Sequence, residues 1–270
     1  MATEIIKRPE REHRSVSTVD GGTALSTTAT VIGLPTGTTN ITLLPRNFSS
    51  PTSVWKWAKV PWLTILKTTD ALATTTNLTD ASVNAQDGSV STSVTLSSLS
   101  TLANGDALYV GSYEQFRGVN IDIDAANGTA SVLTVDYWDG DTWADTSATD
   151  GTTSGGATFA IDGSVTWTVP SAWAKVSLRR AAPTNVNSPM LIEPNMYWTR
   201  WSVSVALDSS TTLDHMLALS RSTAYAELLQ NNGWEEALQV GPGGYAAIEA
   251  LVSSGTANLI VNASAKTRFA

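Results

Sequence analysis

The chain has 270 residues and no cysteine, so its length fits one or two domains with a buried core, and disulfides and thiolate-bound metals are excluded. An apolar fraction of 42% and a charged fraction of 15% are typical of a folded protein, and no stretch reaches the ~18 apolar residues needed to cross a bilayer. The net charge of −8 argues against a nucleic-acid partner, which requires a basic face.

Residues 1–19 are predicted to form an extended N-terminal arm. The arm lacks the apolar core of a signal peptide, so we expect synthesis in a cytoplasm and no membrane partner. Four of its residues are basic, namely Lys7, Arg8, Arg11 and Arg14. They are candidates for docking the arm onto a neighbouring subunit, and the alternative is a solvated, flexible terminus.

The first third of the body reads as short strands. Residues 28–32 and 40–44 are strand candidates, and residues 54–67 form the most apolar segment, in which Pro61 predicts an edge or a bulge. Residues 67–87 are rich in Thr, Ser and Asp and are expected to be a long connection at a domain boundary, with one weak strand as the open alternative.

The middle of the chain carries the clearest strand pattern. Residues 89–96 alternate apolar and hydroxyl side chains, which predicts a strand with Val90, Val94 and Leu96 on one face. Further strands are expected at residues 107–111, 118–124, 131–138, 164–169, 174–178 and 196–205. Asn-Gly and Asp-Gly pairs separate several of them, and this spacing predicts an antiparallel β-sandwich or jelly roll.

The C-terminal part contains the one convincing helix pattern, at residues 223–230, which predicts about two turns. Residues 246–252 and 258–262 read as closing strands. The predicted fold class is therefore all-β, with antiparallel sandwich or jelly-roll domains and one short helix near the C-terminus.

An economical domain arrangement pairs the two ends of the chain. Residues 20–75 and 211–270 would form one β-domain, and residues 76–210 would form an inserted acidic β-sandwich. The acidity is uneven, because the segment from Asp70 to Asp162 holds thirteen carboxylates and a single basic residue, Arg117.

Few side chains suit catalysis. His13 and His215 are the only histidines, and His13 lies in the arm, so a Ser-His-Asp arrangement is not expected. Walker A, GxGxxG and HExxH motifs are absent. A glycosidase pair of carboxylates stays open, because sequence does not give the separation of two carboxyl groups. We expect neither an enzyme nor a cofactor.

Three carboxylates, those of Asp139, Asp141 and Asp145, fall in one predicted turn. They could bind calcium, although the spacing and the terminal Glu of an EF-hand loop are absent. The favoured interpretation is a hairpin turn in which Asp and Gly supply the backbone geometry.

Six of the ten tryptophans lie in the predicted inserted domain: Trp138, Trp143, Trp167, Trp173, Trp198 and Trp201. Such residues usually fill a sandwich core or a subunit interface. Trp167 is expected to point to the face opposite Val165 and Val169, where its ring could stack on a sugar or contact another subunit.

Five segments of the middle region resemble a β-sandwich module found in virion proteins of tailed bacteriophages. They are DALYVG at 106–111, FRGVNIDI at 116–123, LTVDYWDGDTW at 133–143, DGSVTWTVPSAW at 162–173 and YWTRWSV at 197–203. The resemblance spans roughly residues 104–207, under half of the chain.

The resemblance implies a structural role in the virion and no catalytic residues. Similar modules occur in head decoration or cement proteins and also in tail, baseplate and fibre components. We therefore expect a homo-oligomeric capsid decoration protein whose partners are other virion proteins, such as the major capsid protein or tail and neck proteins. The alternative is a tail, neck or fibre component that binds a glycan on the host surface.

Overall fold

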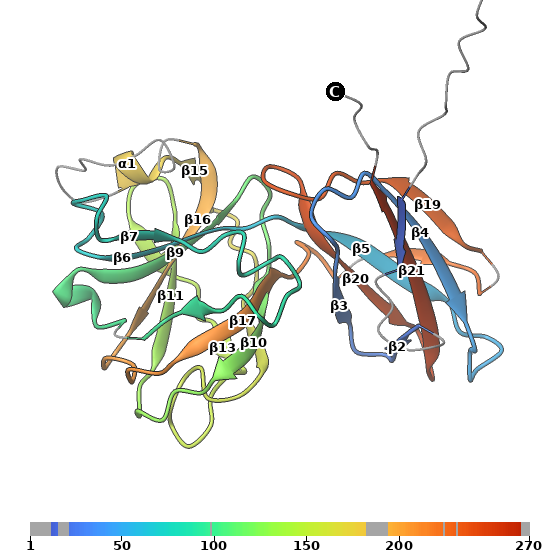
Figure 1. Cartoon of the computed structure of the whole chain (residues 1–270), viewed down its shortest axis with the longest axis horizontal. Helices are drawn as coiled ribbons and strands as arrows, with labels where there is room; N and C mark the ends of the chain where they lie inside the picture. Colours follow the sequence, from blue (N-terminus) through green and yellow to red (C-terminus); the bar gives the residue numbers. More distant parts are fainter. Residues whose placement is uncertain are drawn as a thin grey trace, which may run out of the picture.

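The computed structural model describes residues 12–15, 22–97, 99–181, 194–223, 225–230 and 232–265. Nearly all regular structure in these ranges is β, arranged in four sheets whose named strands all pair antiparallel. The prediction of an all-β, antiparallel sandwich protein is confirmed. Figure 1 shows two lobes side by side, one coloured mainly blue and red and the other mainly green, yellow and orange.

The blue and red lobe, here called the terminal unit, is built from both ends of the described chain (Figure 1). One of its sheets has the order β1-β21-β4-β19, with β2 also on β21, and the other has the order β18-β5-β20-β3. Its strands are β1 (Glu12–Ser15), β2 (Thr23–Leu25), β3 (Thr30–Gly33), β4 (Asn40–Arg46), β5 (Trp55–Pro61), β18 (Ala226–Leu228), β19 (Trp234–Ala237), β20 (Tyr245–Val252) and β21 (Ala257–Ala265). Buried side chains from both sheets, such as Ile41, Trp55 and Val261, form its core.

The other lobe, here called the middle unit, packs a sheet of order β13-β14-β10-β17-β8 against one of order β12-β11-β16-β9-β6-β7, in which β15 also pairs with β16. Its strands are β6 (Thr64–Thr69), β7 (Leu78–Asp80), β8 (Val94–Thr95), β9 (Asp106–Ser112), β10 (Gly118–Ala125), β11 (Leu133–Trp138), β12 (Trp143–Asp145), β13 (Thr149–Asp150), β14 (Gly163–Thr166), β15 (Lys175–Val176), β16 (Met196–Val203) and β17 (Thr212–Ala218). A 3-10 turn, Leu102–Asn104, and helix α1, Leu178–Ala181, complete this unit.

The sheets divide the chain at other positions than the expected boundaries. Strand β6 precedes residue 76 and β17 follows residue 210, yet both pair with strands of the middle unit. Residues 67–87, expected to be mainly a connection, include the end of β6 and all of β7. The two chain crossings between the units therefore lie between β5 and β6 and between β17 and β18.

Strand β9 lies inside the middle unit and is buried along its whole length. One face of its sheet contributes to the sandwich core, and the other face carries a second apolar cluster that includes Tyr109, Trp138 and Trp198. Leu178 and Ala181 of α1 belong to this second cluster, so the segment around α1 covers the outer face. A sheet with both faces covered explains why the middle unit needs so many tryptophans.

Two secondary-structure predictions were wrong. Residues 226–228, within the predicted helix at 223–230, form β18, which pairs with β5, and the described α-helix is α1, far from the C-terminus. Of residues 89–96, only Val94–Thr95 form a strand, and Val90 is 73% exposed. The Asp87 carboxylate explains this difference, because it accepts hydrogen bonds from the Ser89 N–H and the Thr92 hydroxyl and so holds a turn.

Among the described residues, no helix is both long and apolar enough to span a membrane.

Candidate functional site

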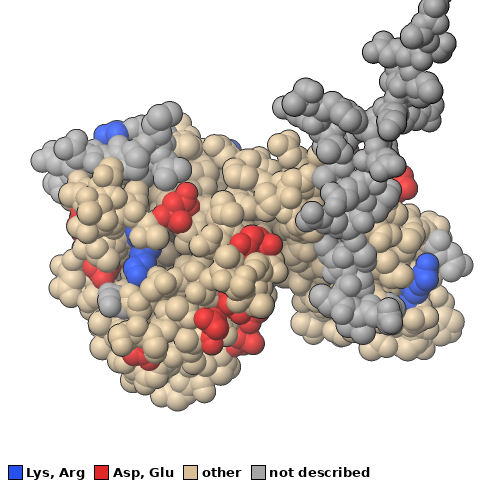
Figure 2. Space-filling view, in the orientation of Figure 1, with Lys and Arg blue, Asp and Glu red and all other residues tan. Residues whose placement is uncertain are grey.

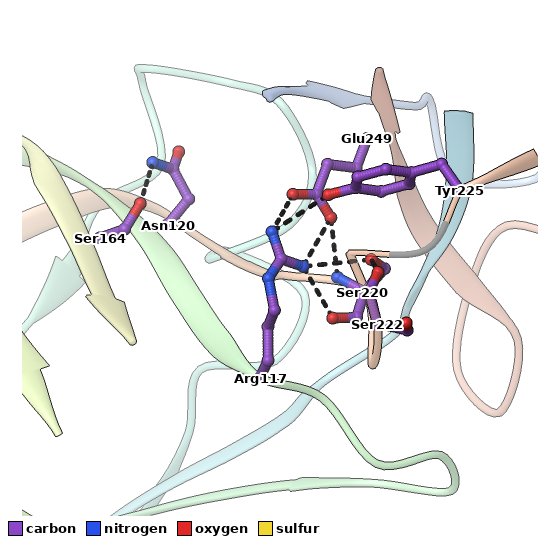
Figure 3. Close-up of polar contacts among 7 residues, drawn as sticks. All are labelled: Arg117, Asn120, Ser164, Ser220, Ser222, Tyr225 and Glu249. Carbon is purple, nitrogen blue, oxygen red and sulfur yellow. Dashed lines mark hydrogen bonds and ion pairs between the residues drawn. The ribbon is translucent and has the colours of Figure 1, made fainter. Parts of the chain in front are cut away.

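The most elaborate polar arrangement lies where the two units meet. Arg117, just before β10 of the middle unit, extends its guanidinium to the carboxylate of Glu249 on β20 of the terminal unit (Figure 3). Arg117 Nη1 donates to Glu249 Oε2 at 2.9 Å, and Nη2 donates to Oε1. The Glu249 side chain is fully buried and that of Arg117 is 17% exposed, so this is a buried, bidentate ion pair.

The connection between β17 and β18 joins the same network. The Ser220 N–H donates to Glu249 Oε2 at 2.9 Å, and Arg117 Nη1 donates to the Ser220 carbonyl at 2.7 Å. Arg117 Nη2 also donates to the Tyr225 hydroxyl at 3.2 Å (Figure 3). One guanidinium thus ties together the middle unit, the terminal unit and one of the two crossings between them.

The surroundings of the pair keep both partners charged. Burial alone would raise the pKa of Glu249, but the hydrogen bonds from Arg117 and from the Ser220 N–H lower it overall. Burial would likewise lower the pKa of Arg117, and the hydrogen bond and charge of Glu249 raise it overall. Burial, together with the Glu249 charge, raises the pKa of Tyr225 to about 12, so its hydroxyl stays protonated at neutral pH.

A second polar contact joins the units on the same strand, β20. Tyr245 donates its hydroxyl to Glu114 Oε1, in the loop after β9, at 3.2 Å. The Lys59 ammonium lies 5.4 Å from the centroid of the Tyr245 ring, within the range of a cation–π contact. Polar contacts at the first residue of β20 and near its middle therefore both join the two units.

Apolar packing is continuous across the junction. Val60, Ala246 and Ala247 of the terminal unit belong to the same buried cluster as Leu217 and Ala218 of the middle unit. Apolar burial supplies non-directional stability, and the Arg117 network supplies directional contacts. Both kinds of contact therefore connect the two sandwiches.

Trp167 was expected on the face opposite Val165 and Val169, and this expectation was wrong. Residues two apart in a strand share a face, and Val165 and Trp167 are both buried, with Trp167 only 6% exposed. The Trp167 ring packs edge-on against Phe116 and Trp201. It therefore offers no open face for a sugar or for another subunit.

The three carboxylates of the predicted turn lie in the β11–β12 hairpin. Asp139 Oδ1 accepts hydrogen bonds from the N–H groups of Asp141 and Thr142, which lower the pKa of Asp139. Asp145 Oδ1 accepts from the Ser147 N–H. Asp139 thus shapes the hairpin turn, and Asp145 shapes the bend that follows β12. No group of three or more His, Cys, Asp or Glu that could hold a metal occurs among the described residues.

Of the basic arm residues, Lys7, Arg8 and Arg11 lie outside the described residues. Arg14 lies in β1, whose backbone pairs with β21 in the register Arg14↔Ala263. The backbone of this part of the arm thus adds an edge strand to the terminal unit.

Acidic side chains gather on the middle unit around a bulge in β17. Asp214 lies there near Asp122 and Asp124 of β10, and burial together with these like charges raises the pKa of Asp214. His215 Nδ1 lies 3.4 Å from Asp122 Oδ2. Figure 2 shows Asp and Glu outnumbering Lys and Arg on the visible face of this lobe.

Comparisons of the chain with family models, with curated proteins and with solved structures found no match.

The junction network was not predicted from sequence, although two signals pointed to it. Arg117 is the single basic residue between Asp70 and Asp162, and a lone cation in so acidic a segment suggests a specific partner. Glu249 gave a second signal, because it interrupts the apolar run of the predicted strand at 246–252. Only the fold shows that these two residues, 132 positions apart, meet.

Proposed function

We propose that the chain is a non-enzymatic structural component of a tailed-phage particle, most simply a decoration or cement protein that bridges neighbouring capsid subunits. The observation that carries the proposal is the junction, where the Arg117–Glu249 pair and a continuous apolar cluster unite two sandwiches. A bridging protein must transmit force between two contact surfaces, which requires a stiff connection between them.

Two further observations support a structural role. In the described part of the chain, the most elaborate polar network joins the two units, and its ion pair is buried rather than open to a substrate. The resemblance of residues 104–207 to virion β-sandwich modules suggests which assembly the protein serves.

A tail or fibre component that binds a glycan is the competing function. The aromatic residue considered for that role, Trp167, is buried among other rings, which favours the decoration role over sugar binding.

Co-sedimentation with mature, empty and expanded phage heads, and separately with isolated tails, tests the proposal. We expect saturable binding to heads and loss of that binding in a chain lacking residues 1–19. A full-length variant with Lys7, Arg8, Arg11 and Arg14 changed to Gln separates the charge of the arm from its length. Binding to tails alone would move the protein to the tail, and binding to neither structure would refute the proposal.

A further inference from the structure

Strand β19 presents an open edge on the terminal unit. It pairs with β4 on one side, and no strand among the described residues pairs with its other side. The Leu238 N–H donates to the Thr39 carbonyl, so the alternation of antiparallel pairing turns the backbone groups of Glu235 and Ala237 away from β4. Unpaired backbone groups of this kind are a template for another strand.

The β19 edge carries exposed apolar side chains, which are unusual at a strand edge that contacts only water. Trp234 is 39% exposed and Leu229, in the preceding loop, is 65% exposed. Glu236 forms an ion pair with Lys59 at 2.7 Å, whereas exposed Glu235 has no ion-pair partner among the described residues. Exposed apolar groups beside an unpaired carboxylate suit a partner strand that carries positive charge.

Pairing of β19 with the β19 of a second copy is disfavoured. A two-fold antiparallel pairing would bring Glu235 and Glu236 of one copy opposite those of the other, and like charges opposite one another are destabilising. The chain does contain an edge strand in a basic segment, namely β1, which includes Arg14 and follows Lys7, Arg8 and Arg11.

Strands β1 and β19 are the two ends of the same four-strand path, β1-β21-β4-β19. They also lie at the same height along the strand direction. Arg14 pairs with Ala263, Ala263 pairs with Ile41, and Ile41 pairs with Glu236, so these four residues form one row across the sheet. Successive strands along the path alternate in direction. A second copy placed beside the first in the same orientation would therefore set its β1 antiparallel to β19.

We propose that the β19 edge of one copy pairs with the β1 edge of a second copy, so that one sheet continues from subunit to subunit. This contact is head-to-tail, and repetition of it builds a ring or a filament. The partner is a second copy of this chain, and the contact does not depend on the proposed place in a phage particle.

Because the chain has no cysteine, a single introduced cysteine is the only thiol available to a cross-linker. Ala237→Cys and His13→Cys put thiols on the same row of the two edges. A short thiol cross-linker should join the two variants when they are mixed, well above the yield from either variant alone. Asp141→Cys, an exposed position on the middle unit, gives the background level. The proposal would be overturned if Ala237→Cys alone gave the same yield of cross-linked dimer as the mixture. It would also be overturned if the mixture gave no higher yield than Asp141→Cys.

Charge variants of the full chain provide a second readout by sedimentation velocity. Glu235→Lys should weaken self-association, because it adds positive charge opposite a basic segment. Ser15 lies in the same row as Glu235, so adding Ser15→Glu to the same chain should restore the association. Asp141→Lys makes the same change in net charge on the other unit and should leave association unchanged. Equal effects of Glu235→Lys and Asp141→Lys would show that only net charge matters and would contradict the paired edges.

Discussion

At the scale of single residues, the junction depends on the carboxylate of Glu249, which accepts hydrogen bonds from protein groups instead of from water. Glu249 receives hydrogen bonds from Arg117 and from the Ser220 N–H, so its charge is buried but satisfied. Such a pair adds little net stability compared with an apolar pair of similar size, yet removal of one partner leaves an unpaired buried charge. The network therefore specifies one arrangement of the two units.

We expect Glu249→Gln to lower the free energy of unfolding by about 3–5 kcal/mol, because Arg117 would keep a buried charge without its counter-ion. The double variant Arg117→Met with Glu249→Leu should lose clearly less than the two single variants combined. Urea denaturation measures these losses.

The exposed pair between Lys56 and Glu227 provides the control, since the Glu227 side chain is 61% exposed. Glu227→Gln should cost less than ~1 kcal/mol. If Glu249→Gln lowered the free energy of unfolding no more than Glu227→Gln does, the buried pair would not hold the junction.

Acid should destabilise the fold partly through Asp208. Hydrogen bonds from the backbone of Gly128 and Ser210, with one from the Thr211 hydroxyl, lower the pKa of Asp208 from 3.8 to about 2. A carboxyl with a lowered pKa stabilises the fold above pH 3.8, and this contribution is lost as the pH falls towards 2. Asp208→Asn should therefore flatten the loss of stability across that window, as measured by denaturant unfolding at a series of pH values.

Asp214 provides a control, because its pKa is shifted in the opposite direction to that of Asp208. Its pKa is raised by burial and by Asp124 and Asp122, so its contribution to stability is present below pH 3.8 and is lost as the pH rises. Asp214→Asn should make the protein more stable at neutral pH relative to its stability in acid. Identical pH profiles for wild type, Asp208→Asn and Asp214→Asn would contradict both assignments.

At the scale of strands, the pairing of β9 with β16 depends on one close approach. A Cβ added at Gly111 would lie 2.4 Å from Cε3 of Trp198, a fully buried ring. Gly111→Ala should therefore force the ring or the strand to move and cost about 1–3 kcal/mol. Thermal or urea unfolding measures the change.

Gly128→Ala is the matched substitution, because its nearest neighbour, Asp208 Oδ2, lies 3.6 Å away, at ordinary contact distance. It should change the free energy of unfolding by much less than Gly111→Ala. Equal stabilities of the two variants would mean that Trp198 can be displaced at no cost.

The strands that sequence predicted best are those with apolar residues and clear turn signals. Residues 40–44, 107–111, 118–124 and 246–252 all lie within observed strands or overlap them closely. The failures occurred where other contacts decided the conformation. Residues 223–230 carry good helix formers, but β18 gains hydrogen bonds to β5, and tertiary pairing outweighs local propensity.

Candidate site residues were harder to predict than strands. The hairpin role of Asp139 followed from local turn chemistry, since its hydrogen bonds reach only two and three residues along the chain. The burial of Trp167 and the meeting of Arg117 with Glu249 depend on how sheets stack, and this is non-local information that periodicity does not carry.

At the scale of the whole molecule, two sandwiches joined by two chain crossings could hinge unless side chains lock them. The locks are the Arg117 network, the contact of Tyr245 with Glu114 and the shared apolar cluster. Connections between domains are mobile by default, so these contacts decide whether the protein acts as a stiff bridge.

The distance between spin labels on the two units tests the rigid junction most directly. Labels at Thr52→Cys in the terminal unit and Asp141→Cys in the middle unit occupy exposed positions in a chain without other thiols. Double electron–electron resonance should give one narrow distance distribution, and adding Glu249→Gln should broaden it. A distribution that is already broad in the otherwise unchanged chain would contradict the account of two sandwiches held as one body.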